Sequence, residues 1–306
     1  MKTEIAVEIT ELSKRFGSTQ AVDRLSLSVD AGEMFGLVGP DGAGKTTTIR
    51  MLCGAISPDS GDANVLGHSL AEDIVGIKQE IGYLSQKFSL YGDLTVDENI
   101  EFFAEIHNVN SYSERRNQLL RFTRLTPFRD RLAERLSGGM RQKLALACTL
   151  IHTPKLIFLD EPTVGVDPVS RRDFWMILAD LLKQGITVFL TTPYLDEAER
   201  CTRVALMNEG RIMVCDSPSK LKTLMKGSML ELVSPEIRKT YNLLKMAQGI
   251  SEIQAFGDRL HLVVEDSGNS EEKIRQLLAT GGIPIESIRR IAPSLENVFI
   301  SMVRYG

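Results

Sequence analysis

Long apolar runs are the first feature that the sequence lacks. No stretch approaches the ~20 consecutive apolar residues that a membrane-spanning helix requires. The first residues, Met1-Lys2-Thr3-Glu4, are polar and belong to no long apolar segment, so the sequence does not predict a secretory signal. We therefore expect a cytoplasmic protein.

Cysteine and histidine are scarce and scattered. The four cysteines are widely spaced and include no Cys-x-x-Cys pair, which predicts reduced and mostly buried thiols. No cysteine–histidine cluster has the spacing of a metal site, so surface or packing roles are expected for the histidines. These residues are Cys53, Cys148, Cys201, Cys215, His68, His107, His152 and His261.

The sequence also has no excess of positive charge. Its formal net charge of -4 gives no overall basic field, so nucleic acid is not an expected partner. A chain of 306 residues is long enough for about two domains.

A glycine-rich stretch at 39–46 matches the phosphate-loop pattern of Gly, four free positions and Gly-Lys-Thr. The residues before it, 34–38, predict a short buried strand, and those after it, 47–52, predict a helix. Free backbone N–H groups and the helix dipole attract anions at such a helix start. We predict that Lys45 bridges the β- and γ-phosphates of a nucleotide and that the Thr46 hydroxyl holds Mg²⁺.

A second glycine-rich helix start lies at Ser137-Gly138-Gly139, before the helical run 140–150. It is again suited to an anion. The alternative is a plain helix cap, but two glycines are more than a cap requires.

Two carboxylates end an apolar run at 156–159 that predicts a buried parallel strand. Ligands of open α/β sheets sit at the carboxyl ends of strands. Asp160 is suited to Mg²⁺, directly or through water, and Glu161 to the role of general base. Gln86 ends another predicted strand and could reach Mg²⁺ or the attacking water, but taken alone it is best interpreted as an exposed glutamine. Phe16 alone is best interpreted as a core aromatic at a strand end.

The remaining segments complete an α/β chain. A helical insertion is predicted at about 87–150, with a capping box formed by Thr95 and Glu98. Asp167 and Pro168 predict the start of a helix that runs to about 183. The last ~80 residues show a βαββαβ order plus a terminal helix, which indicates a small ferredoxin-like α+β domain.

With these motifs in order, residues 1 to about 225 resemble the ATP-binding subunits of ABC transporters. The stretches 90–99, 194–199 and 293–299 are most similar to the drug-export group, whose daunorubicin-exporter-like members pair with ABC-2-type permeases. The resemblance implies a phosphate-loop ABC ATPase core at 1–225, made of a β-subdomain, a parallel α/β sheet and a helical subdomain. Residues 226–306 would form the accessory domain.

The resemblance also implies roles for individual residues. Phe16 would stack on adenine, and Gln86 would sense Mg²⁺ and water and couple to the permease. Asp160 would help place the metal, Glu161 would be the base, and Asp167 would lie across a dimer interface. The phosphates and Mg²⁺ would be held by Gly39, Pro40, Asp41, Gly42, Ala43, Gly44, Lys45, Thr46 and Thr47. The nucleotide of a partner subunit would be contacted by Ser137, Gly138 and Gly139.

The implied assembly is an ATP-bound homodimer or heterodimer with another ABC ATPase. It would use ATP and Mg²⁺, act with a separate integral membrane ABC-2-type permease, and lie peripherally on the inner face of the cell membrane. We expect ATP-driven export of a small molecule or drug.

One position departs from the family pattern. The resemblance places a histidine after the strand 186–192, where this chain has Pro193. Proline has no side-chain donor, and loss of one transition-state donor typically costs about 2.7–4 kcal/mol. We therefore predict strong ATP binding with slow hydrolysis, unless the hydroxyl of Tyr194 substitutes.

Two alternatives to an exporter motor stay open. A soluble ABC ATPase acting on ribosomes or DNA is disfavoured, because translation-type members usually carry two ATPase halves in one chain, whereas this chain has one and no basic excess. A mainly ATP-binding, regulatory subunit of a heteromeric exporter is the second, and Pro193 motivates it.

Overall fold

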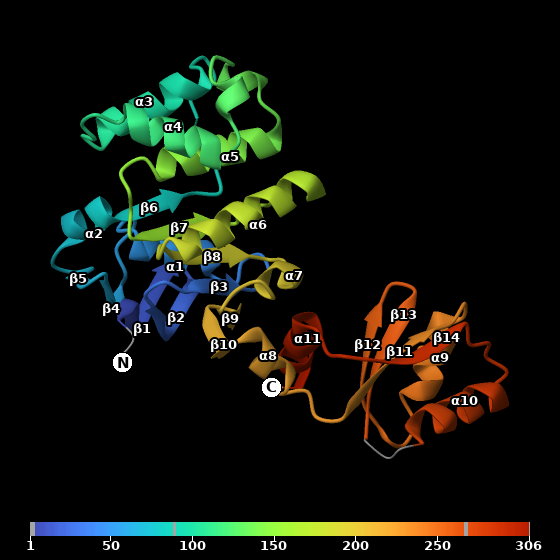
Figure 1. Cartoon of the computed structure of the whole chain (residues 1–306). Coiled ribbons are helices and arrows are strands. Elements are labelled where there is room, and N and C mark those ends of the chain that lie inside the picture. The colour runs from blue at the N-terminus through green and yellow to red at the C-terminus, as the bar shows by residue number, and fades with distance from the viewer. Residues whose placement is uncertain (1–3, 88–89, 266–268, 306) are drawn as a thin grey trace. The chain divides into compact units, whose positions relative to one another are not determined.

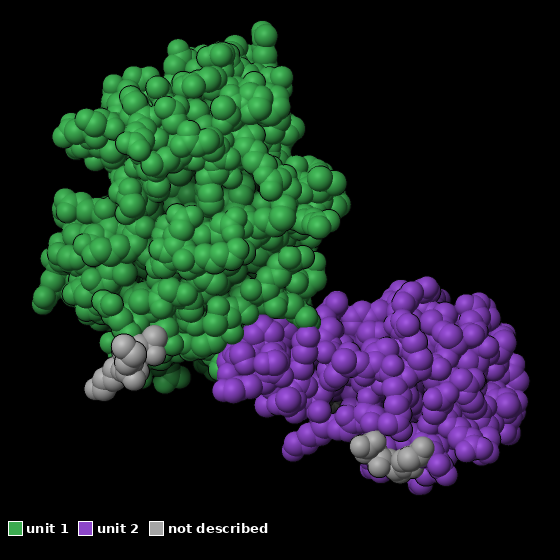
Figure 2. All heavy atoms as spheres, viewed as in Figure 1, with its two compact units in different colours: residues 1–215 green, residues 216–306 purple. Residues whose placement is uncertain are grey.

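The computed structural model describes residues 4–87, 90–265 and 269–305, and the chain forms two compact units (Figure 2). They are Met1–Cys215 and Asp216–Gly306, so the division lies ten residues before the boundary expected at 225/226. The reason is α8 (Pro218–Lys222), which packs on α11 (Leu295–Tyr305) of the second unit and has its Leu221 side chain buried.

A six-stranded sheet forms the centre of the first unit, in the order β10-β9-β3-β8-β7-β6. β3, β7 and β8 are buried at every position, as expected for parallel strands that are covered on both faces. This confirms the strands predicted at 34–38 and 156–159. The strand bounds are β3 (Met34–Val38), β6 (Ile81–Leu84), β7 (Leu156–Asp160), β8 (Thr187–Thr192), β9 (Arg203–Asn208) and β10 (Arg211–Asp216).

A second, antiparallel sheet has the order β2-β1-β4-β5. Its first two strands form a long antiparallel ladder whose register shifts at several bulges or irregularities. The sequence patterns did not predict α2. The bounds are β1 (Ile5–Phe16), β2 (Thr19–Asp30), β4 (Ser60–Val65), β5 (His68–Ser69) and α2 (Ile74–Glu80).

One apolar core joins the two sheets of the first unit. It includes Val7 and Leu25 of the antiparallel sheet, Phe35 and Phe158 of the parallel sheet, and Ile49 of α1 (Lys45–Leu52). Because α1 lies inside this core, its first turn is held against the carboxyl edge of the parallel sheet.

Helices fill the described residues of the predicted insertion at 87–150, the green part of Figure 1 beyond β6, whereas residues 88 and 89 lie outside the described residues. Its helices are α3 (Val96–Ile106), α4 (Ser113–Phe122) and α5 (Gly138–Thr149), with short 3₁₀ turns at 126–128 and 133–135. The capping box is present: the Thr95 hydroxyl accepts from the Glu98 N–H at 3.2 Å, and the Glu98 carboxylate accepts from the Thr95 N–H at 2.7 Å.

The remaining helices of the first unit are α6 (Pro168–Lys183) and α7 (Leu195–Ala198). Asp167 caps α6 through hydrogen bonds from the N–H groups of Val169 and Ser170, as its sequence predicted. None of the helices within the described residues is long and apolar enough to cross a membrane.

The second unit has the predicted βαββαβ order and a terminal helix. Its antiparallel sheet has the order β12-β13-β11-β14, and Leu230, Leu260 and Leu278 belong to its own core. The bounds are β11 (Ser228–Val233), α9 (Ile237–Leu244), β12 (Ile250–Phe256), β13 (Arg259–Val264), α10 (Ser270–Thr280) and β14 (Ser287–Ile291).

Candidate functional site: a phosphate loop and two carboxylates

The loop between β3 and α1 requires glycine at two points of close backbone approach. Gly44, the N-cap of α1, has φ +107°, and a Cβ there would lie 2.3 Å from the Ala21 carbonyl oxygen. A Cβ on Gly39 would lie 2.1 Å from the carbonyl oxygen of Met207. The first turn of α1 has no acidic residue and no side-chain cap. Its N–H groups and dipole are thus available to an anion.

Lys45 extends from the first turn of α1 into this loop and is 3% exposed. Its Nζ atom donates to the carbonyl oxygens of Gly39 at 2.9 Å and Pro40 at 3.0 Å. It also lies 3.1 Å from Oε1 of Glu161. The ammonium is therefore fixed by backbone carbonyls and faces the carboxyl end of β7.

Asp160 is fully buried at the end of β7. Its Oδ1 atom accepts hydrogen bonds from the hydroxyls of Thr46 at 2.9 Å and Thr191 at 2.8 Å. Its Oδ2 atom is also buried and has no hydrogen-bond partner among the described residues. Burial, reinforced by the charge of Asp160, raises the pKa of the nearby Tyr83 to about 12.

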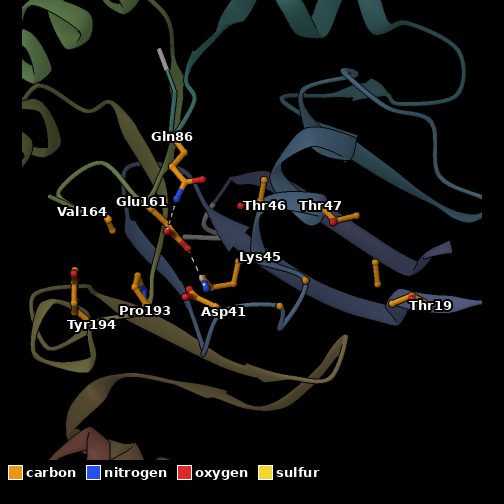
Figure 3. A pocket seen from close by; sticks show the side chains of 13 residues that line it. Thr19, Asp41, Lys45, Thr46, Thr47, Gln86, Glu161, Val164, Pro193 and Tyr194 are labelled. Atoms are coloured by element: carbon orange, nitrogen blue, oxygen red, sulfur yellow. Dashed lines mark hydrogen bonds and ion pairs between the residues drawn. The ribbon is translucent and has the colours of Figure 1, made fainter. Parts of the chain in front are cut away.

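Glu161 has a left-handed backbone with φ +51°, which is strained for a residue other than glycine. Its N–H is held by the carbonyl oxygen of Thr191 at 3.2 Å and by the hydroxyl of that threonine at 3.0 Å. The Nε2 atom of Gln86 donates to Oε2 of Glu161 at 3.0 Å. Figure 3 shows Gln86, from the turn after β6, and Lys45, from α1, converging on Glu161.

A cavity of about 710 Å³ opens beside these groups. It brings together eight of the residues predicted from the sequence: Asp41, Gly42, Gly44, Lys45, Thr46, Thr47, Gln86 and Glu161. Pro193 also lines it, together with four residues that the motifs did not predict as phosphate-binding: Thr19, Ala21, Val164 and Tyr194 (Figure 3). None of the four histidines lines this cavity.

Other predicted site residues lie outside the cavity lining. Phe16 is 51% exposed at the end of β1, with Nζ of Lys14 5.7 Å from its ring centroid. Ser137, Gly138 and Gly139 begin α5, where the Ser137 hydroxyl accepts from the N–H of Met140 at 3.3 Å. Their assignment to adenine and to a partner's nucleotide therefore stays a prediction.

The structure adds a group that sequence patterns missed. Glu197 of α7 is 2% exposed and accepts hydrogen bonds from the hydroxyls of Thr163 and Thr192. The only signal in the sequence was a threonine pair ending a β-branched strand shortly before an acidic helical turn. Nothing local indicated that this glutamate is buried.

The fold and the site define the class of protein, a phosphate-loop ATPase. Two family models match the chain: one described as "ABC transporter" at residues 22–164, and one described as "ATP-binding protein DrrA1-3-like, C-terminal domain" at residues 217–303. A solved ATP-binding subunit of an ABC transporter has a TM-score of 0.65 and 27% identity. That likeness covers 72% of this chain and 92% of the other.

Curated relatives extend the similarity over nearly the whole chain. The daunorubicin resistance ATP-binding protein DrrA2 of Streptomyces coeruleorubidus is 34% identical over 97% of this chain and 94% of its own length. The Nod factor export ATP-binding protein I of Ralstonia nicotianae is 34% identical, with 97% and 93% covered. The probable multidrug ABC transporter ATP-binding protein YbhF of Escherichia coli is 40% identical over 98% of this chain, which spans only 52% of that relative.

The chain thus belongs to the family of ABC transporter ATP-binding proteins. It is an ATP-binding ATPase of the ABC type with a DrrA-like C-terminal domain.

Proposed function

We propose that this chain powers export of a small molecule or drug through a separate ABC-2-type membrane permease. The observation that carries the ATPase half of the proposal is the convergence of Lys45, Gln86 and Glu161 at one edge of the sheet. The printed names of its relatives, which include daunorubicin resistance, multidrug and Nod factor export proteins, support the transport half.

Lys45 and the N–H groups of the loop 39–47 would bind and orient the phosphates of ATP. Glu161 would take a proton from the attacking water, and Gln86 would hold that water in line. The strained backbone of Glu161 fits this role, because strain at a functional site persists only when neighbours hold it in place.

The residues around Thr46 fit Mg²⁺, which prefers oxygen ligands. The Thr46 hydroxyl donates to Asp160, whose second carboxylate oxygen is buried and has no partner within the described part of the chain. Thr46 and Gln86 would contact the ion and Asp160 would help place it. The bound ion would neutralise charge on the β- and γ-phosphates.

We further propose that two such subunits, identical or different, form the working ATPase. Ser137, Gly138 and Gly139 begin α5 and are not among the residues that line the chain's own nucleotide cavity, so a helix start of this kind would suit a partner's ATP. Phe16 is exposed, as an aromatic that stacks on adenine must be. The assembly would lie on the inner face of the membrane against its permease, without nucleic acid.

A second candidate function follows from Pro193. This residue lines the cavity at the end of β8, and it offers no hydrogen-bond donor. A mainly ATP-binding, regulatory subunit of a heteromeric exporter would show that feature, with hydrolysis occurring at the site of another subunit.

The proposal is tested by nucleotide binding and by native partners. Lys45→Ala should weaken binding of a fluorescent ATP analogue by at least about tenfold, as expected for a lost charge-assisted phosphate contact. Lys155→Ala, which removes an exposed lysine paired with Glu80 before β7, is the control and should bind normally. Native purification should recover a polytopic membrane protein. Recovery of ribosomes or DNA instead would contradict the transport half.

A further inference from the structure

A buried carboxylate connects three segments around the cavity. Oε1 of Glu197 accepts a hydrogen bond from the Thr163 hydroxyl at 2.6 Å, and Oε2 accepts one from the Thr192 hydroxyl at 2.8 Å. All three side chains are buried. We call Thr163, Thr192 and Glu197 the Glu197 bracket.

An arginine of α6 forms an ion pair with the carboxylate of the Glu197 bracket. Nε of Arg171 lies 3.4 Å from Oε1 of Glu197, which compensates the buried negative charge. The guanidinium also lies over the ring of Tyr194, 4.8 Å from its centroid. The carboxylate thus has two hydroxyl donors and one cation, as a buried charge requires.

The two threonines of the bracket adjoin functional groups of the cavity. Thr163 lies two residues after Glu161, in the loop that leads to Asp167. The Thr192 carbonyl accepts from the N–H of Gly39 at 3.4 Å, and its hydroxyl accepts from the N–H of Tyr194 at 3.0 Å. The bracket therefore spans the start of the phosphate loop, the segment that follows the base and both neighbours of Pro193.

We propose that Glu197 is a positioning residue for ATP hydrolysis: it fixes the loop after Glu161 against the end of β8. This inference rests on the proposed role of Glu161 as the base. Because Pro193 supplies no donor, the alignment of Glu161 and its water depends on the backbone around it. The two threonine hydroxyls set that backbone through one carboxylate.

A purely structural role predicts a different outcome. Glu197 contributes no atom to the cavity lining, so its loss should leave ATP affinity intact. Misplacing a catalytic group by about 1 Å can cost on the order of 10²-fold in rate. If Glu197 positions the loop, its replacement should lower the hydrolysis rate per bound ATP and leave ATP affinity unchanged. If Glu197 only stabilises the fold, its replacement should lower the unfolding temperature and the amount of active protein, but not the rate per bound ATP.

The chain offers a matched control at the opposite end of the same sheet. Glu33, just before β3, is also a buried carboxylate, and its Oε1 lies 3.1 Å from Arg203 and accepts from the N–H of Asp30 at 2.8 Å. Glu33 does not line the cavity. Glu33→Gln therefore removes a comparable buried charge without changing the carboxyl ends of the strands, where the nucleotide would bind.

The test uses the full chain with MgATP. Single-turnover hydrolysis measures the rate, and binding of a fluorescent ATP analogue measures affinity. We expect Glu197→Gln and Thr163→Val each to lower the rate by roughly tenfold or more, with affinity within about twofold of wild type. Thr163→Ser, which keeps the hydroxyl, should restore most of the rate. Glu33→Gln should keep the rate per bound ATP while lowering the midpoint of thermal unfolding.

Three results would overturn the inference. One is an unchanged rate in Glu197→Gln or Thr163→Val. Another is an equal loss of rate in Glu33→Gln and Glu197→Gln. The third is a wild-type chain that binds ATP but does not hydrolyse it even in a single turnover, which would also remove the proposed role of Glu161.

Discussion

The Nζ atom of Lys45 and the carboxylate of Glu161 lie 3.1 Å apart, although they come from different elements, α1 and the end of β7. Both side chains are largely buried, so the pair is more strongly coupled than an exposed ion pair would be. Phosphate oxygens and Glu161 would compete for the same ammonium. Binding of ATP would thus draw Lys45 to the phosphates and release Glu161 toward water.

The first prediction concerns Glu161→Gln. Removing the carboxylate leaves Lys45 free for phosphate, so ATP affinity should stay equal or rise. Loss of a general base should lower the single-turnover rate by roughly 10²–10⁴-fold. Glu199→Gln, at an exposed glutamate beyond α7, is the control and should hydrolyse ATP at the wild-type rate. Equal rates in Glu161→Gln and wild type would assign the base elsewhere.

The second prediction concerns Pro193→His. An added imidazole at the cavity wall should raise the hydrolysis rate by roughly 10²-fold if one transition-state donor is missing. Affinity for ATP should change little. Pro193→Ala removes the proline without adding a donor, so it separates backbone effects from the donor. If wild type already turns over rapidly and the histidine adds nothing, slow hydrolysis is the wrong interpretation of this site.

The third prediction compares two neighbouring glycines at the start of α5. A Cβ on Gly138 would meet no atom of the described residues within 4 Å, whereas a Cβ on Gly139 would lie 2.2 Å from the Ser170 hydroxyl oxygen of α6. Gly138→Ala should therefore keep wild-type stability yet weaken ATP-dependent dimerisation, because the added methyl group would face the partner's nucleotide. Gly139→Ala should also unfold at lower temperature.

Sedimentation with an ATP analogue and thermal unfolding measure the two effects of these glycine variants. Normal dimerisation and hydrolysis in Gly138→Ala would contradict a composite site at the start of α5.

The fourth prediction concerns stability in acid. Burial lowers the pKa of His152 to about 4 and lowers that of His107, whose ring stacks on it at 4.0 Å. As pH falls, these imidazoles are therefore protonated at a higher pH in the unfolded chain than in the folded chain. The stability that neutral His152 contributes is complete above about pH 6.5 and is lost as pH falls toward 4.

Urea unfolding at pH 7 and pH 5 measures this loss. Because His152 is partly exposed, we expect only about 1–2 kcal/mol of its contribution to disappear between these values. His152→Gln keeps a donor for the carbonyl oxygen of Ile81, to which His152 bonds at 2.9 Å. The variant should lose less stability than wild type over the same range. An equal loss in both proteins would refute the assignment.

Features set by neighbouring residues could be predicted from the sequence. The capping box of Thr95 and Glu98 and the cap of α6 by Asp167 form between residues two to three positions apart. The strand, loop and helix start around Gly39–Thr46 follow equally from local pattern. Glycine is needed there because backbone atoms approach closely, and lysine because phosphates are anionic.

Distances between remote segments could not be predicted in this way. The two compact units divide after Cys215 and not at the expected 225/226, because α8 packs on α11 of the second unit. Phe16, taken alone, was expected to be a core residue. Its ring is instead exposed at the end of β1.

The sequence by itself determined the phosphate loop, the acidic strand end, the helix caps and the βαββαβ order of the last ~80 residues. These depend on side-chain type and on spacing within a few residues. Only the tertiary structure decided that Lys45 pairs with Glu161 and that Glu197 is buried between Thr163 and Thr192. Sheet order and packing bring such residues together, because burial of a carboxylate is favourable only where distant chain segments supply its donors.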